Sequence, residues 1–331
     1  SVINILIYIP MKKLTLLLLA LLYVTLTYAY TERDLLQKQA DINRLKEILV
    51  LDRQWVTYPD YNDRAGWDRF LGTFKDEYIR RGEKRLNYQW QVVKATDYLA
   101  FERTGNRQIM EKPFGANNGA IADLLMAELA EGKGRFVDQL INGVFNACEM
   151  TSWALAAHII VQPSHRALPA YDYPVIDLTS GDLGGLLAWT YHFMRPSFDK
   201  VDPEISRRLR HELQTRILDP YMNNDSSWWM GRNHNRPIHN NWNPWCNSNA
   251  LMCFMLLEDN RDTLAKAVHL TMESVDKFLN YIKADGACEE GPSYWGHAAG
   301  KTLDYLELLS DITGDKVNIF NEPMIKNMGE Y

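Results

Sequence analysis

Apolar residues recur at three- and four-residue spacing along most of the chain, as in amphipathic helices. The expected helices cover residues 31–50, 64–83, 88–103, 117–131, 135–161, 176–194, 203–218, 245–257, 261–283 and 293–313. Sustained alternation of apolar and polar positions, which would indicate strands, is almost absent. The pattern therefore predicts an all-α protein.

Turn-forming residues separate these helices, for example at 104–106, 131–134 and 285–286. Short connections between helices favour antiparallel helical hairpins. The spacing is compatible with either a helical solenoid or a closed toroid of hairpins. No low-complexity linker divides the chain, so residues 30–331 are expected to form one domain.

The N-terminal region has the composition of an export signal. Met11-Lys12-Lys13 precede an apolar run over 14–27 and the small residue Ala29. This run is shorter than the roughly 20 residues that a membrane-spanning helix needs. We expect residues 1–29 to comprise an upstream extension and a secretory signal, leaving a secreted or periplasmic protein with no integral membrane span.

Charge and cysteine usage narrow the functional classes. The net charge of −6 offers no basic stripe for nucleic acid, so an anionic ligand would need a local basic cleft. Cys148, Cys246, Cys253 and Cys288 show no CxxC pair and no metal-finger spacing. No metal or other cofactor is expected.

Tryptophans gather in the C-terminal part of the chain, among polar neighbours, at Trp228, Trp229, Trp242, Trp245 and Trp295. A single tryptophan usually fills a core. A group of this kind favours a sugar-binding cleft, because a flat aromatic ring packs against the face of a pyranose.

The segment 228–249, WWMGRNHNRPIHNNWNPWCNSN, is too rich in asparagine for a helix interior. We expect a loop that leads into a helix beginning near Pro244. Asn241 or Asn243 would serve as the cap of that helix in the alternative, purely structural interpretation. A cap needs only one residue of the run HNNWN at 239–243, so the run as a whole favours a function.

The segment 283–300, KADGACEEGPSYWGHAAG, breaks at Gly291-Pro292 and then begins a helix with Tyr294 and Trp295. A tyrosine at such a helix start can direct its hydroxyl into a cleft, although packing at the surface is the ordinary role of a single tyrosine.

The two segments together contain the groups that β-elimination from a uronic acid requires. The C5 proton becomes acidic only when the neighbouring carboxylate is neutralised, which an amide can do. A base must remove that proton and an acid must protonate the departing O4. Asparagine for the carboxylate, with tyrosine or histidine for the proton steps, is sufficient and needs no metal.

These motifs resemble those of the heparinase II/III-like polysaccharide lyases. The resemblance rests on HNNWNPWCNSN at 239–249 followed by ADGACEEGPSYWGH at 284–297. CEMTSWALAAH (148–158), VIDLTSGDLGGLLAWTY (175–191) and RILDPYM (216–222) are also similar to stretches of that family.

The resemblance implies an incomplete (α/α) toroid, usually followed by a β-sandwich domain. It makes Tyr294 the general acid and often also the base, and Asn241 or Asn240 the group that neutralises the carboxylate. Family members usually take a further catalytic histidine from the β-sandwich, which is expected to be absent from this chain. His239 is the nearest candidate to assist, with a loop hydrogen bond as its alternative role.

Six further residues are predicted to contact substrate or to orient the site. Trp153 and His158 are placed near the cleft by the resemblance, Glu290 is expected to orient the loop or Tyr294, and Arg236 suits bidentate binding of sulfate or carboxylate. Trp242 and Trp295 complete the set.

The expected activity is therefore lysis of an anionic, uronic-acid-containing polysaccharide, either a glycosaminoglycan or an alginate-like polymer. One alternative is a glycoside hydrolase on a similar toroid, such as an unsaturated uronyl hydrolase, with Glu290 paired to Asp182 or Asp285. A second is a non-catalytic glycan-binding protein of an uptake system.

Overall fold

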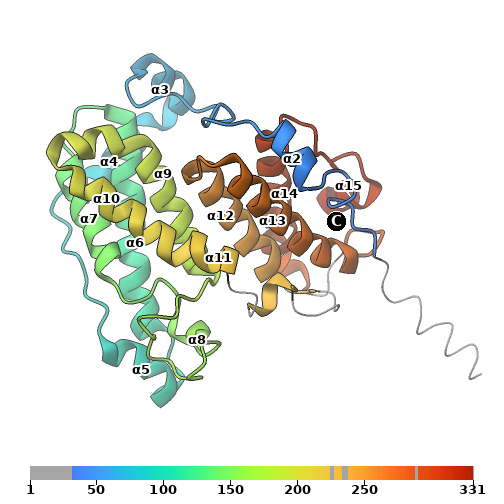
Figure 1. Ribbon diagram of the computed structural model, residues 1–331. Helices are drawn as coiled ribbons and strands as arrows, with labels where there is room; N and C mark the ends of the chain where they lie inside the picture. Colours follow the sequence, from blue (N-terminus) through green and yellow to red (C-terminus); the bar gives the residue numbers. More distant parts are fainter. Residues whose placement is uncertain (1–31, 224–226, 233–237, 288–289, 331) are drawn as a thin grey trace, which may run out of the picture.

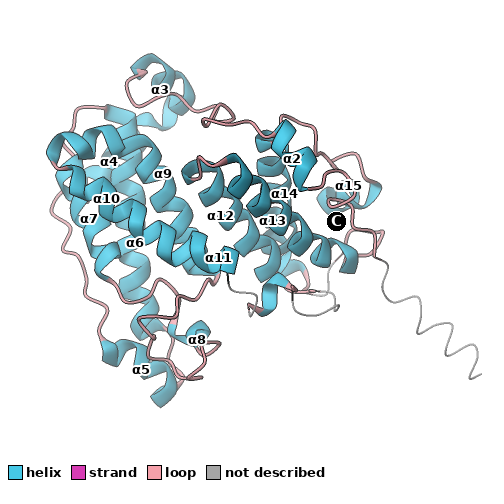
Figure 2. Ribbon diagram, in the orientation of Figure 1, coloured by secondary structure: helices cyan, strands magenta, loops and turns pink. Residues whose placement is uncertain are grey.

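The computed structural model describes residues 32–223, 227–232, 238–287 and 290–330 (Figure 1). Its α-helices are α2 (Ile42–Ile48), α3 (Arg64–Leu71), α4 (Lys75–Glu83), α5 (Ala95–Thr104), α6 (Gln108–Glu131), α7 (Val137–Glu149), α8 (Ala156–Ile159), α9 (Leu178–Val201), α10 (Pro203–Leu213), α11 (Asp219–Asn223), α12 (Trp242–Leu257), α13 (Arg261–Tyr281), α14 (Pro292–Ile312) and α15 (Pro323–Glu330). Short 3₁₀ segments, η1 (Gly72–Phe74) and η3 (Trp228–Met230), and a π-helical segment, η2 (Gln214–Leu218), complete the regular structure. The described residues contain no strand (Figure 2), which confirms the all-α prediction.

The helices form two groups that meet between α9 and α12. On one side lie α4, α6, α7, α9 and α10, and on the other α12, α13 and α14 with α2 and α15 (Figure 1). Helix α9 packs along α12, and α12 also packs against α13 and α14. Buried apolar side chains form one cluster that extends from Leu36 to Met328. Helix α12 therefore lies at the centre of the C-terminal group.

Side-chain caps fix several helix starts. The carboxylate of Asp177 accepts a hydrogen bond from the backbone N–H of Ser180 at 2.8 Å, at the start of α9. Asp202 caps α10 in the same way, with Pro203 in the first turn. Such caps stabilise a helix by about 1 kcal/mol, because they satisfy N–H groups that have no partner within the helix.

The prediction of a helix over 31–50 is wrong for most of that segment. The described part of it forms turns up to Asp41, with Asp34 at a φ of 47°, and α2 begins only at Ile42. Asn280 Oδ1 accepts from the backbone N–H groups of Arg33 and Asp34, at 2.7 and 3.0 Å. Asn280 lies in α13, so a contact with that distant helix satisfies these two N–H groups. This contact fixes the backbone conformation here, in place of the helix that the local pattern predicts.

Other expected helices are interrupted by local geometry. The segment 64–83 breaks at Gly72, which has a φ of 51°. The segment 88–103 is helical only from Ala95, because Asn117 pairs with both the N–H and the carbonyl of Gln91, at 3.0 and 2.7 Å.

The segment expected as one helix over 135–161 ends at Glu149 and resumes only as the short α8. Two helices start earlier than expected, α6 at Gln108 and α12 at Trp242. Helix α15 was not predicted.

None of the helices in the described ranges has the length and apolarity that a membrane crossing requires. The expected signal segment at 11–29 lies outside the described residues.

We predict that Asn280→Ala lowers the free energy of unfolding by about 1–3 kcal/mol, because two backbone donors lose their buried acceptor. The measurement is urea denaturation, with tryptic cleavage at Arg33 and Lys38 as a local readout. The exposed Asn62→Ala is the matched control and should change stability by less than about 0.5 kcal/mol. Equal stabilities of the two variants would contradict the role of Asn280.

Candidate functional site

The start of α12 carries the asparagine pair that the sequence identified. Asn240 Oδ1 accepts from the backbone N–H of Trp242 at 2.9 Å, so Asn240 satisfies a donor of the first turn. Asn241 occupies the capping position but has helical backbone angles, and its side chain makes no capping bond. The purely structural role considered for Asn241 is therefore filled by its neighbour.

Glu290, just before α14, holds Asn241 through both carboxylate oxygens. Its Oε2 accepts from the backbone N–H of Asn241 at 3.0 Å, and its Oε1 accepts from Asn241 Nδ2 at 3.1 Å. This bidentate contact fixes the orientation of the amide, because a carboxylate can only accept. The two motifs of the sequence are thus joined by a direct interaction.

The protonation of Glu290 controls this contact. Burial raises the pKa of the Glu290 carboxyl, while the two hydrogen bonds from Asn241 and the nearby His239 and His297 lower it in part. As pH falls through this raised pKa, Glu290 gains a proton and one of its acceptor oxygens becomes a donor. The contact with Asn241 is therefore lost at a higher pH than an ordinary glutamate would imply.

The Asn241 side chain retains unused hydrogen-bonding capacity. It is only 5% exposed, and its Oδ1 is buried without a donor among the residues that the structure describes. Its Nδ2 carries two hydrogens, of which Glu290 takes one. Among the described residues, one donor and one acceptor of this buried, oriented amide therefore have no partner.

Tyr294 lies in the first turn of α14, after the turn at Gly291, which has a φ of 76°. Its backbone N–H donates to the Gly291 carbonyl at 3.2 Å. The side chain is 54% exposed, so a ligand can reach it, and its ring centroid lies 6.0 Å from that of His297. Glu290 and Tyr294 therefore reach the site from the same helix start.

A strip of polar and aromatic side chains continues from Tyr294 across α14, α12 and α9. His297 stacks on Trp245, with centroids 4.8 Å apart, and Lys301 Nζ lies 5.6 Å from the Trp245 centroid. Trp245 Nε1 and Asn249 Nδ2 both donate to Asp182 Oδ1, at 2.7 and 2.8 Å. We call these five residues the Trp245 strip.

Sequence reasoning did not single out most of the Trp245 strip and weighed Asp182 only as a hydrolase carboxylate. Isolated polar residues on amphipathic helices resemble an ordinary solvated face. The available signal was GDLGG at 181–185. A Cβ added at Gly181 would lie 3.1 Å from Asn249 Nδ2, so the missing side chain lets α12 approach Asp182. Loss of solvation raises the pKa of Asp182.

His158 and Trp242, the first residue of α12, have ring centroids 4.6 Å apart. His158 Nδ1 lies 2.6 Å from the buried Asp177 carboxylate, which places the proton on Nδ1. Arg107 Nη2 lies 3.2 Å from His158 Nε2. The ring centroids of Trp228 and Trp242 lie 5.3 Å apart. Trp228, Trp242 and His158 thus form a small aromatic cluster at the start of α12.

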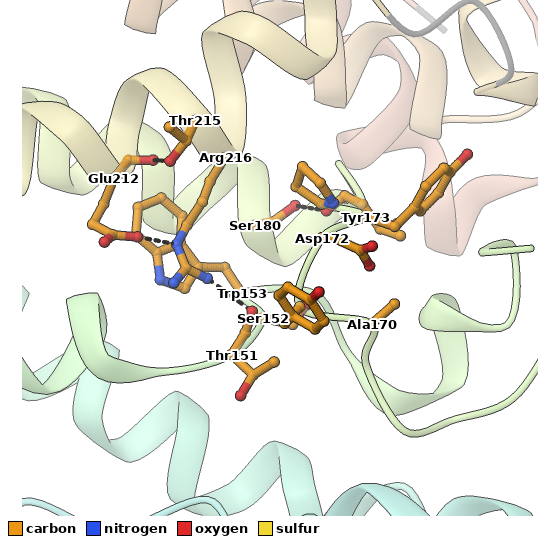
Figure 3. Close-up of a pocket in the computed structure, with 13 residues that line it drawn as sticks. Thr151, Ser152, Trp153, Ala170, Asp172, Tyr173, Ser180, Glu212, Thr215 and Arg216 are labelled. Carbon is orange, nitrogen blue, oxygen red and sulfur yellow. Dashed lines mark hydrogen bonds and ion pairs between the residues drawn. The ribbon is translucent and has the colours of Figure 1, made fainter. Parts of the chain in front are cut away.

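Trp153 lies under a separate cavity of about 300 Å³ (Figure 3). Its ring is 2% exposed, and its Nε1 donates to the Ala147 carbonyl at 2.8 Å. The guanidinium of Arg216 covers the ring at 5.0 Å from the centroid. Trp153 therefore supports Arg216, and neither Asn241 nor Tyr294 lines this cavity.

The remaining predicted residues have different surroundings. His239 is exposed, with its ring 5.3 Å from that of Tyr281. Trp295 is partly buried against the core. Arg236 lies outside the described residues.

Comparison of the chain with protein-family models gives no match, and a search of curated proteins finds no similar sequence. Within the described ranges, no three His, Cys, Asp or Glu side chains gather closely enough to hold a metal ion.

Proposed function

We propose that this protein is a polysaccharide lyase of the heparinase II/III-like type, which cleaves uronic-acid-containing polymers by β-elimination. The observation that carries the proposal is the amide of Asn241, held by Glu290 at the helix start that also bears Tyr294. An oriented amide and an accessible phenol are the two groups that this reaction uses.

We further propose that the helical hairpins form an incomplete (α/α) toroid. Support comes from the packing of consecutive helices against each other, as in α6 with α7, α9 with α10 and α12 with α13. Export, which we also propose, rests on residues 11–29 alone.

Asn241 would bind the uronate carboxylate of the substrate. The Nδ2 hydrogen that Glu290 does not use donates to a carboxylate oxygen and withdraws negative charge from it. The C5 proton then becomes more acidic, because the carbanion that forms on its removal is delocalised into a neutralised carboxyl group. Glu290 contributes by holding the amide in one orientation before substrate arrives.

Tyr294 would perform the proton steps. A phenolate removes the C5 proton, the C5–H electron pair forms the C4–C5 double bond, and the C4–O4 bond breaks. The departing O4 takes a proton from the phenol thus formed, so the tyrosine ends in its starting state. The ring of His297, with its centroid 6.0 Å from that of Tyr294, would assist in these proton steps.

Aromatic side chains flank these groups and suit the faces of neighbouring sugars. Trp242, at the start of α12, has Trp228 and His158 against it. Trp245, one turn further along the same helix, stacks on His297. Such rings contribute binding energy that holds the polymer across the reacting bond.

A glycoside hydrolase is the second candidate, favoured by one observation. Loss of solvation raises the pKa of both Asp182 and Glu290, as expected for a general acid. However, both oxygens of Glu290 are occupied by Asn241, and Asp182 accepts from Trp245 and Asn249. These contacts favour positioning roles for the two carboxylates.

We predict that Tyr294→Phe lowers the rate of unsaturated uronate formation by about 10²–10⁴-fold, the usual contribution of a general acid or base. The measurement is the ultraviolet absorbance of the 4,5-unsaturated product, with a panel of uronic polysaccharides as substrates. Binding of the polymer should persist, because only the hydroxyl is removed.

The matched control for this variant is Tyr171→Phe, which removes the hydroxyl of a tyrosine that is 88% exposed and lines the separate cavity. It should keep the parental rate. Unchanged turnover in Tyr294→Phe would remove Tyr294 from the mechanism.

We predict that Glu290→Gln lowers kcat by about 10- to 100-fold, because the amide of glutamine can accept only one of the two hydrogen bonds from Asn241. The pH profile supplies a second readout. In the parent, kcat should fall on the acid side at a pH above the ordinary glutamate pKa, because Glu290 gains its proton there.

That acid limb should be missing from Glu290→Gln, whose side chain does not titrate. Glu322→Gln, the same loss of charge at a residue outside the site, should keep the parental kcat and the parental fall of kcat at acid pH. An acid limb that survives unchanged in Glu290→Gln would show that another group controls it.

A further inference from the structure

A shallow depression of about 240 Å³ lies at the far end of the Trp245 strip, between α12, α14 and the segment before α3. It was not recognised in the sequence. Its lining residues are Tyr58, Ser248, Asn249, Met252, Lys301, Asp304, Glu307 and Leu308.

The depression is continuous with the candidate active site. Tyr294, His297, Lys301 and Asp304 fall on one face of α14, at helical spacing. Tyr294 contacts His297, and Lys301 pairs with Asp304. Trp245 of α12 joins the two pairs, because it contacts both His297 and Lys301. Ten residues of helix separate Tyr294 from Asp304, which is about 15 Å along the axis. A polymer bound at Tyr294 can therefore extend into the depression by a few sugar units.

One wall of the depression is an aromatic side chain with an accessible surface. Tyr58 is 43% exposed, and its ring is held edge-to-face by Trp189 at 5.3 Å and by Phe70 at 5.2 Å. Met252 and Leu308 add apolar surface. A rigid ring with apolar neighbours suits the C–H face of a pyranose.

The charges around the depression disfavour an anion. Lys301 Nζ lies 3.2 Å from Asp304 Oδ2 and is thereby largely neutralised. Glu307 adds a second carboxylate, and Asp182 lies near Lys301 as well. With more negative than positive groups, a sulfate or carboxylate here is repelled, whereas sugar hydroxyls can donate to the carboxylates and to Asn249.

We propose that this depression is a distal subsite for an uncharged, hydroxyl-rich sugar of the polymer, and that it selects against sulfation of that unit. The proposal rests on the proposed function, because it assumes a bound polysaccharide. Tyr58 packs against the face of the sugar, and the carboxylates of Asp304 and Glu307 repel a sulfated unit.

The test uses the full chain carrying Tyr294→Phe, so that the ligand is not consumed. Two hexasaccharides of alternating glucuronate and N-acetylhexosamine are titrated by calorimetry, one unsulfated and one with a sulfate ester on each hexosamine. The unsulfated hexasaccharide should bind about two- to fivefold more tightly, the size expected for repulsion between partly exposed charges.

Two added substitutions, each with a matched control, locate the effect. Glu307→Gln should bring the two affinities closer together, while Glu322→Gln should leave their ratio unchanged. Tyr58→Ala should weaken binding of both hexasaccharides about tenfold, and Phe74→Ala, at an aromatic residue that is 67% exposed outside the depression, should not. Circular dichroism and Tm verify that each variant is folded.

Equal affinities for the two hexasaccharides, or a ratio that Glu307→Gln leaves unchanged, would overturn the inference. Failure of both to bind would overturn it for this class of polymer. Neither result touches the lyase proposal, which is judged by the formation of unsaturated product in the parent chain.

Discussion

Helix α12 is buried along most of its length, although asparagines occupy its first two turns, and their amides must find partners inside the protein. Asn243 donates to the carbonyls of Trp229 and Ser274, at 2.8 and 2.9 Å. Asn247 Oδ1 accepts from the hydroxyl of Tyr221 at 2.6 Å. Asn241 completes the series with Glu290. These bonds place the start of α12 against α13, η3 and the segment that leads into α14.

The same constraint creates the site. Because α12 is fixed on three sides, Trp245 stacks on His297 of α14, and Asn241 is held by Glu290 at the start of that helix. The amide of Asn241 is oriented by Glu290, whose pKa is raised by burial, so in the proposed mechanism the binding of an anionic substrate would be coupled to the protonation of Glu290. Under the proposed function, preorganisation of this kind, rather than global charge, would let a protein of net charge −6 act on an anionic polymer.

Helical periodicity was enough to predict the fold class and most helix positions, since buried faces dominate the pattern. It failed where distant side chains capture the backbone, as Asn280 does at Arg33 and Asn117 does at Gln91. The motifs placed Asn241, Glu290 and Tyr294 in one hypothesis, but the contact between Glu290 and Asn241 depends on how α12 and α14 pack. Lys301 was missed, and Asp182 was considered only as a hydrolase carboxylate, because each is a single polar residue on a helix and only packing brings it to Trp245.

Cleavage by elimination is tested most directly by the masses of the two fragments released from a defined uronic hexasaccharide. Elimination adds no water, so the two masses should sum to that of the substrate, and the fragment with the new non-reducing end should carry the double bond. A sum that exceeds the substrate by one water would show hydrolysis and would contradict the account, with Asp182 and Glu290 then the first carboxylates to consider.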